Sequence, residues 1–156
     1  MKKLILVTIS VILCLHLSLS AQSKDFQSLY DKYSKTEGYS SVSLGKKMLQ
    51  AIAQKNGSDA NLAKLVDGIS SITIISSKLE DDSLVNDFHS YVTNPHFSKM
   101  GERSDNGESS EFYLAESGKS SSTFVMLSVT KTKTTIVRIV GYFNVKDISK
   151  LSEIVK

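Results

Sequence analysis

A long stretch of alternating apolar and polar residues, from Phe97 to Phe143, constrains the fold of this chain more than any other feature. Neighbouring side chains on a β-strand point to opposite faces, so alternation with period two is typical of strands. Three turn signals interrupt the stretch, at Asp105-Asn106-Gly107, at Gly118-Lys119 and from Lys131 to Lys133. The pattern predicts a four-stranded antiparallel meander.

Before this stretch, the apolar residues recur at helical spacing. Four of them between Phe26 and Tyr33 fall at i, i+3, i+4 and i+7, which is the pattern of one helix face. The same reasoning predicts helices over 25–35, around 48–53, from Ala60 and over 84–92. Asp81 and Asp82 precede the last of these helices, at the position where a carboxylate stabilises a helix N-terminus.

Short strands and a last helix complete the prediction. Residues Ser41 to Leu44 alternate, and Ser71 to Ser76 are rich in isoleucine, so both segments are expected to be strands. After Asn144 the apolar residues return to helical spacing, starting with Val145. We therefore expect an α+β fold: N-terminal helices with short strands, then a four-stranded antiparallel meander and a C-terminal helix.

The first residues form a different kind of segment. Met1-Lys2-Lys3 gives a positive start, Leu4 to Leu19 is almost entirely apolar, and small residues stand just before a polar stretch that begins at Gln22. This is the pattern of a secretory signal peptide. The apolar run has about 16 residues, fewer than the roughly 20 that span a bilayer. We therefore expect residues 1–21 to be removed, residues 22–156 to form a single domain, and no transmembrane span to remain after processing.

Cys14 is the single cysteine of the chain, and it lies inside the segment to be removed. Lipoprotein signals place a small residue before the modified cysteine, whereas Leu13 stands there, so a lipid anchor is not expected. Without cysteine the exported domain forms no disulfide, and a packed core of about 135 residues must stabilise it.

The charge of the domain argues against nucleic acid as a partner. The chain has 19 Lys and Arg against 16 Asp and Glu, and Lys2 and Lys3 belong to the signal peptide. The remaining net charge is about +1, so the charge gives no indication of a basic surface that would bind the phosphate backbone of a nucleic acid.

Few residues are suited to catalysis or to metal binding. His89 and His96 are the histidines of the domain, and a zinc site needs three or four ligands. No serine lies in a Gly-x-Ser-x-Gly elbow, and Gly118-Lys119-Ser120 lacks the earlier glycine of a phosphate-binding loop. We assign no catalytic, cofactor-binding or metal-binding residue and expect no cofactor. The catalytic alternative is a hydrolase that uses His89 or His96 with a carboxylate.

The meander carries apolar residues on both of its expected faces. Val125, Leu127 and Ile139 belong to the alternating set expected in the core. The other set is also rich in apolar residues and is the possible binding face: Phe124, Met126, Arg138, Val140 and Tyr142. Either helices cover both faces of the sheet, or this second face binds a ligand or a partner.

Acidic residues surround the Asn106-Gly107 turn. A two-residue turn would place Asp105 opposite Glu108 and Glu102 opposite Glu111. Like charges directly opposite each other are unfavourable, so we expect a longer loop, with nearby basic side chains offsetting part of the charge.

Several segments together resemble a known family. They are the exported start, the helical opening from Phe26 to Tyr33, Glu37-Gly38, Val42-Ser43-Leu44 with Lys47-Met48-Leu49, Ile72-Thr73-Ile74-Ile75, and Ile139-Val140-Gly141 with Val145, Ile148 and Leu151. The chain resembles the exported bacterial proteins grouped as domain of unknown function 4252. The resemblance covers nearly the whole exported chain and implies a protein of the Gram-negative envelope, with no activity, cofactor or catalytic residue to carry over.

From these observations we expect a non-catalytic protein of the periplasm or cell envelope of a Gram-negative bacterium. Its partner would be an envelope protein or a small apolar ligand, bound by the apolar second face or the loops beside it. Two other interpretations stay open: the small periplasmic hydrolase described above, and a structural component of an envelope assembly.

Overall fold

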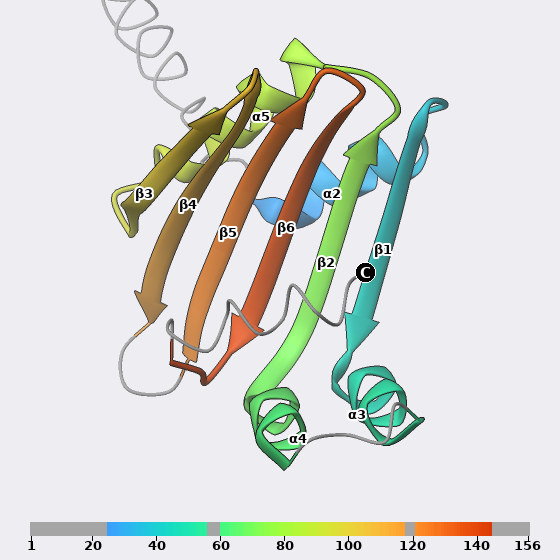
Figure 1. Cartoon of the computed structure of the whole chain (residues 1–156), viewed down its shortest axis with the longest axis vertical. Coiled ribbons are helices and arrows are strands. Elements are labelled where there is room, and N and C mark those ends of the chain that lie inside the picture. Colours follow the sequence, from blue (N-terminus) through green and yellow to red (C-terminus); the bar gives the residue numbers. More distant parts are fainter. Residues whose placement is uncertain (1–24, 56–59, 118–120, 145–156) are drawn as a thin grey trace, which may run out of the picture.

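The computed structural model describes residues 25–55, 60–117 and 121–144. Its strands are β1 (Tyr39–Gly45), β2 (Ile69–Ser77), β3 (Phe97–Asp105), β4 (Glu108–Ser117), β5 (Ser121–Thr130) and β6 (Lys133–Gly141). The helices are α2 (Phe26–Ser34), α3 (Lys46–Lys55), α4 (Ala60–Gly68) and α5 (Asp82–Val92). The strands form one antiparallel sheet in the order β1-β2-β6-β5-β4-β3 (Figure 1). The last of these strands along the chain, β6, therefore lies in the middle of the sheet.

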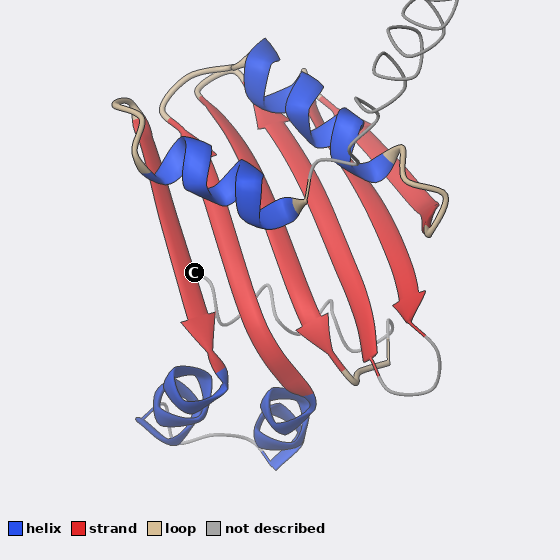
Figure 2. Cartoon of the chain, turned by 180° about the vertical axis from the view of Figure 1, so that it is seen from behind, coloured by secondary structure: helices blue, strands red, loops and turns tan. Residues whose placement is uncertain are grey.

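One face of the sheet, which we call the helix face, is covered by α2 and α5 (Figure 2). Its buried apolar strand side chains are Ile75, Val125, Leu127 and Ile136. Against them pack the apolar stripes of the two helices: Phe26, Leu29 and Tyr33 of α2, and Leu84, Phe88, Tyr91 and Val92 of α5. Burial of these side chains removes apolar surface from water and so holds both helices on the sheet.

Local signals fix where α5 begins and ends. The carboxylate of Asp81 accepts hydrogen bonds from the backbone amides of Ser83 and Leu84 at 2.9 and 3.1 Å. The prediction that acidic residues stabilise this helix N-terminus is confirmed. The structure adds that Asp81 is the capping residue, which satisfies two amides that have no partner within the helix. The helix ends at Val92, two residues before Asn94, because the residue that precedes a proline disfavours helical backbone angles.

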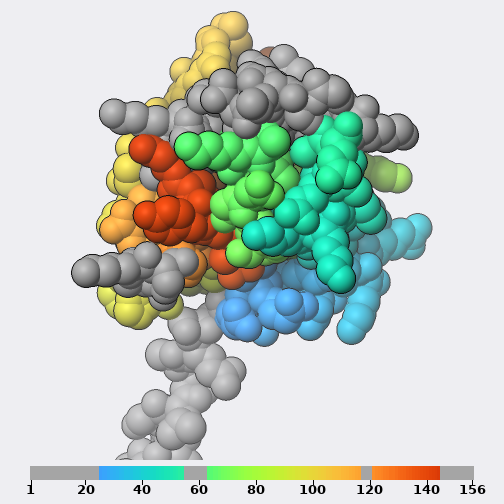
Figure 3. All heavy atoms as spheres, turned by 90° about the horizontal axis from the view of Figure 1, so that it is seen from below, coloured from blue at the N-terminus to red at the C-terminus, as the bar shows by residue number. Residues whose placement is uncertain are grey.

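The opposite face, which we call the open face, carries a second apolar set. The strand residues in it are Leu44, Ile69, Ile72, Ile74, Phe112, Leu114, Phe124, Met126, Val137 and Ile139. At one end of the sheet α3 and α4 add Leu49, Ala53, Leu65 and Val66. Figure 3 shows these two helices side by side, with the end of β6 next to α4.

Glycines permit the close approach of β6 to the start of β2. The backbone amide of Tyr142 donates a hydrogen bond of 2.7 Å to the carbonyl of Gly68. A Cβ atom on Gly68 would overlap the carbonyl oxygen of Tyr142, and one on Gly141 would overlap the carbonyl oxygen of Gly68. Only glycine fits at these two positions without moving the backbone.

The predicted division of the fold is wrong. The sequence predicts N-terminal helices with short strands, followed by a four-stranded antiparallel meander, but all six strands belong to one antiparallel sheet. β1 has seven residues and β2 has nine. β2 joins the sheet because its isoleucines find apolar partners on β6, with Ile72 opposite Ile139 and Ile74 opposite Val137. The predicted C-terminal helix falls on residues 145–156, outside the described residues.

The expected grouping of side chains on β5 and β6 is also wrong. The turn between these strands has two residues, because Thr130 lies opposite Lys133. Ile139 consequently lies opposite Phe124, whereas the sequence prediction placed it on the face of Val125. A change of one residue in register moves every side chain of a strand to the other face, so the predicted second face mixes the two real ones.

The Asn106-Gly107 turn is shorter than expected. Both turn residues have positive φ angles, 51° and 81°, which is typical of a two-residue hairpin turn. Glu102 therefore does lie opposite Glu111. The amino group of Lys99 lies 2.5 Å from Glu102 and 3.7 Å from Glu111, so its charge offsets the repulsion that led us to expect a longer loop.

Candidate functional site

The open face presents apolar side chains across five neighbouring strands. The partly buried ones are Leu44, Ile74, Phe112, Met126 and Val137. Phe124 and Ile139 lie among them and are 6% and 3% exposed. Val42, on the edge strand β1, is 46% exposed. The open face is therefore apolar from β1 to β4.

The two faces differ in what covers them. α2 and α5 lie over the helix face, while among the described helices only α3 and α4 touch the open face, at one end (Figures 1 and 2). A sheet face that water covers should alternate apolar with polar residues, and a contiguous apolar patch marks an interaction surface. The middle of the open face is therefore the candidate functional site.

The structure does not bring the five predicted binding residues together. Phe124 and Met126 lie on the open face. Arg138 and Val140 lie on the helix face, where the guanidinium of Arg138 is 5.0 Å from the centroid of a phenylalanine ring of α2. Tyr142 follows β6 and is 73% exposed. Only the β5 half of the predicted face therefore contributes to the candidate site.

Residues of β2 and β4 complete the open face and are missing from the sequence prediction. Phe112 lies opposite Met126, and Leu114 lies opposite Phe124. Ile74 reaches the same face from β2. The alternation within β4 predicts that Phe112 and Leu114 share a face. The register with the neighbouring strands is needed to tell which face that is.

A cavity of about 410 Å³ lies between α3 and α4. It is lined by Gln50, Ala53, Gln54, Ala63, Val66 and Asp67. Its volume would admit a small molecule. The carboxylate of Asp67 already accepts a hydrogen bond of 3.0 Å from Gln50, and the lining has no aromatic ring. The cavity thus offers few groups that would select a ligand.

His89 does meet a carboxylate. Its Nε2 atom is 3.3 Å from both carboxylate oxygens of Glu111. The hydroxyl of Tyr113 donates to the same carboxylate at 2.7 Å, and Lys99 lies 3.7 Å away. The structure does not bring His96 into this cluster: it lies exposed in the turn before β3. Among the described side-chain hydrogen bonds, the imidazole of His89 has none with a serine or threonine hydroxyl that would serve as a nucleophile.

The neighbours of Glu111 fix its charge. Burial raises the pKa of Glu111, but the hydrogen bond from Tyr113 and the charges of His89 and Lys99 outweigh burial and hold that pKa below its ordinary value. Burial and the adjacent carboxylate raise the pKa of Tyr113 to about 12. Glu111 is therefore ionised at neutral pH, which suits an ion-pair cluster and not a general acid.

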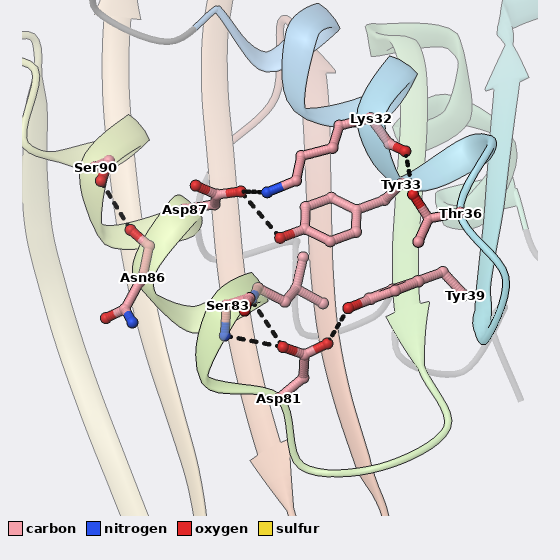
Figure 4. A network of polar contacts seen from close by, with 10 residues as sticks. Lys32, Tyr33, Thr36, Tyr39, Asp81, Ser83, Asn86, Asp87 and Ser90 are labelled. Carbon is pink, nitrogen blue, oxygen red and sulfur yellow. Dashed lines mark hydrogen bonds and ion pairs between the residues drawn. The ribbon is translucent and has the colours of Figure 1, made fainter.

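A second polar network joins α5 and its N-terminal cap to α2 and to β1 (Figure 4). The amino group of Lys32 lies 2.6 Å from the carboxylate of Asp87, and the hydroxyl of Tyr33 donates to it at 2.9 Å. The hydroxyl of Tyr39 donates to Asp81. That hydrogen bond, together with burial, raises the pKa of Tyr39 to about 12. Each contact links two elements of the fold, so the network is structural.

Neither a metal centre nor a membrane span is found in the described part of the chain. No three His, Cys, Asp or Glu residues of that part are grouped so that they could hold a metal ion. Each of its helices is too short or too polar to cross a bilayer.

The sequence matches one described family over most of its length. Residues 33–151 match the model of the family described as Domain of unknown function (DUF4252). No curated protein matches the chain.

Two solved structures are similar over part of the chain: the Ran-binding protein Mog1p of Saccharomyces cerevisiae and a mutant of protein Mog1. Both matches have 13% sequence identity and a TM-score of 0.29, and they cover 55% of this chain and 57% of the other. The chain thus spans little more than half the length of these proteins, and a likeness this weak carries no argument about function.

Proposed function

Because the chain belongs to the DUF4252 family, whose description names no activity, we propose its function from its own surface: it is a non-catalytic binding module of the cell envelope that holds a partner protein on the open face. The observation that carries this proposal is the apolar surface that runs across β1, β2, β6, β5 and β4 on the face away from α2 and α5.

A protein partner fits this surface better than a small ligand does. Ligand sites are concave and enclose most of the ligand. The cavity described above lies between α3 and α4 and not over the middle of the open face. A sheet face with apolar side chains from several strands matches the apolar centre of a protein–protein interface, where aromatic and methionine side chains are enriched. Phe112 and Met126 are the side chains of these types that stay partly accessible.

Export supports an envelope location. The positive start, the apolar run to Leu19 and the small residues before Gln22 have the pattern of a signal peptide. The partner would then be another protein of the periplasm or of the membrane surfaces that enclose it.

Site-specific photo-crosslinking in the living bacterium tests the proposal. A benzoyl-phenylalanine at Phe112 replaces one aromatic ring with a larger one on the open face, and a matched probe at Thr132 stands in the exposed β5–β6 turn. We expect one reproducible protein adduct from position 112 and none from position 132. Equal adducts from both probes, or none from position 112, would contradict the proposal.

Two controls separate the alternatives. An adduct of lipid mass at position 112 would favour the small apolar ligand over a protein. A variant with Val137→Glu places a charge among the partly buried side chains of the open face, and it should abolish the adduct while the circular dichroism spectrum stays that of the folded protein.

A further inference from the structure

The two edges of the sheet are protected very differently. Edge strands expose unpaired backbone amides and carbonyls, and proteins commonly guard them with charges and bulges. The β3 edge has both: the register with β4 shifts between Lys99 and Gly101, and Glu102, Arg103 and Asp105 follow. β3 is therefore built to resist pairing with another chain.

The β1 edge has none of these guards. Its sequence, YSSVSLG, contains no charged residue and no proline. Its register with β2 runs without a bulge from Tyr39 opposite Ser77 to Gly45 opposite Ser71. Among the described strands β1 has one neighbour, β2. A regular, uncharged edge of seven residues is a template for a further strand.

Exposed apolar side chains gather on and beside this edge. Val42 lies at the centre of β1 and is 46% exposed. Met48, in the first turn of α3 directly after β1, is 56% exposed. Leu79 is 71% exposed and follows Ser77, the residue that pairs with the other end of β1. These three are most of the large, exposed apolar residues in the described part of the chain, the others being Met100 and Tyr142.

We infer that β1 pairs with β1 of a second copy of this chain, antiparallel and about a two-fold axis at Val42. In this register Val42 faces its own counterpart, and Ser40 lies opposite Leu44. Residues directly opposite each other in a sheet point to the same face, so the helix faces of both copies fall on one side. The product is one continuous sheet that contains both copies.

Charges beyond the ends of β1 favour a second copy over an unrelated strand. The same two-fold register brings exposed Glu37, in the turn before β1, towards Lys47 of the second copy, at the start of its α3. Because the arrangement is symmetric, this pair forms twice. Parallel pairing would instead set like charges against each other, which is unfavourable.

Pairing also joins the two open faces. Val42 and Leu44 lie on that face at the β1 edge, so two copies in this arrangement share an uninterrupted apolar surface. The backbone pairing of seven residues covers less area than a standard interface, so we expect a reversible dimer that depends on concentration.

Sedimentation velocity of the mature protein purified from the periplasm, over a range of concentrations, tests the dimer. We expect the mass to rise from one chain to two. Val42→Lys places a charge at the centre of the edge and should raise the dissociation constant by roughly tenfold or more. Ser104→Lys places the same charge at an exposed position on the β3 edge; it is the matched control and should leave the dissociation constant unchanged.

Charge exchange tests the register. Glu37→Lys alone and Lys47→Glu alone should each weaken the dimer, and the double variant should restore it. Thermal melts of every variant verify that the fold is intact. A protein that stays monomeric at all concentrations overturns the inference, and so does a dimer that Val42→Lys leaves intact but Met126→Glu on the open face dissociates. Neither result changes the interpretation of a crosslinked adduct at position 112, unless the mass of that adduct shows that the captured protein is a second copy of this chain.

Discussion

Tyr33 and Asp87 meet across the contact between α2 and α5, where the phenol donates a hydrogen bond of 2.9 Å to the carboxylate. The two residues are 54 positions apart in the sequence. Tyr33 is 2% exposed, and burial, followed by its contact with Asp87, raises the pKa of its hydroxyl above the ordinary range. The hydroxyl is therefore protonated at neutral pH and donates to the carboxylate.

Removing this hydroxyl should loosen α2. We expect Tyr33→Phe to lower the free energy of unfolding by about 1–2 kcal/mol, because a hydrogen bond to a charged group is lost while Lys32 still neutralises Asp87. Denaturant titration measures the change. Tyr30→Phe on the same helix is the control and should cost less than about 0.5 kcal/mol. Equal losses in both variants would show that the Tyr33 hydroxyl contributes nothing specific.

Acid should remove the contribution of Asp81. Burial raises the pKa of Asp81, but the hydrogen bonds from Tyr39, Leu84 and Ser83 and the charge of Lys32 outweigh it, so the folded-state pKa lies below 3.8. The stabilisation is complete above the pKa of the unfolded chain and is lost as the pH falls through the folded-state pKa. We expect Asp81→Ala to cost about 1–2 kcal/mol at neutral pH and less near pH 2. Chemical denaturation of both proteins at the two pH values checks this, and a cost independent of pH would contradict it.

Phe124 and Tyr142 should respond very differently to truncation. Phe124 is 6% exposed and belongs to the core cluster of the open face, so Phe124→Ala should cost about 3–5 kcal/mol. Tyr142 is 73% exposed, and Tyr142→Ala should cost less than about 0.5 kcal/mol. Thermal melts rank the two variants. A large loss for Tyr142→Ala would mean that its ring is covered in solution.

Signal processing should leave an N-terminus between Ala21 and Ser23, where the apolar run ends and the chain becomes polar. Intact-mass measurement of the exported protein decides this. A mass that corresponds to a lipid-modified Cys14 would contradict both the processing and the expected release from the membrane.

Local patterns predicted the elements well because they depend on neighbouring residues alone. The spacing of Phe26, Leu29 and Tyr33 identified a helix face that is buried, and Asp81 and Asp82 were recognised as acidic residues at the start of a helix. The family suggested by the sequence is also confirmed. The helix and capping signals each lie within a single element. The family match is the sum of many weak signals spread over the chain.

The sheet could not be predicted in the same way, because pairing joins distant residues. Alternation shows which side chains of one strand share a face. It does not show which of the two alternating sets on the next strand lies on that same face of the sheet. That depends on whether the connecting turn has an even or an odd number of residues. The turn between Thr130 and Lys133 has two residues, an even number, and this places Ile139 on the same face as Phe124. The place of β2 beside β6 has no local signal at all. The open face was therefore only half recognised.

The central place of β6 determines when the sheet can be completed. Ser77 and Thr134 are in contact across β2 and β6, although they are 57 positions apart in the sequence. Any process that delivers the chain from its N-terminus, whether synthesis or passage through a membrane pore, releases β1 and β2 long before their neighbour arrives. Two strands without a third are at most marginally stable in water. β1 and β2 therefore cannot become part of a stable sheet until β6 has been delivered, so the sheet is completed only when nearly all of its strands are available.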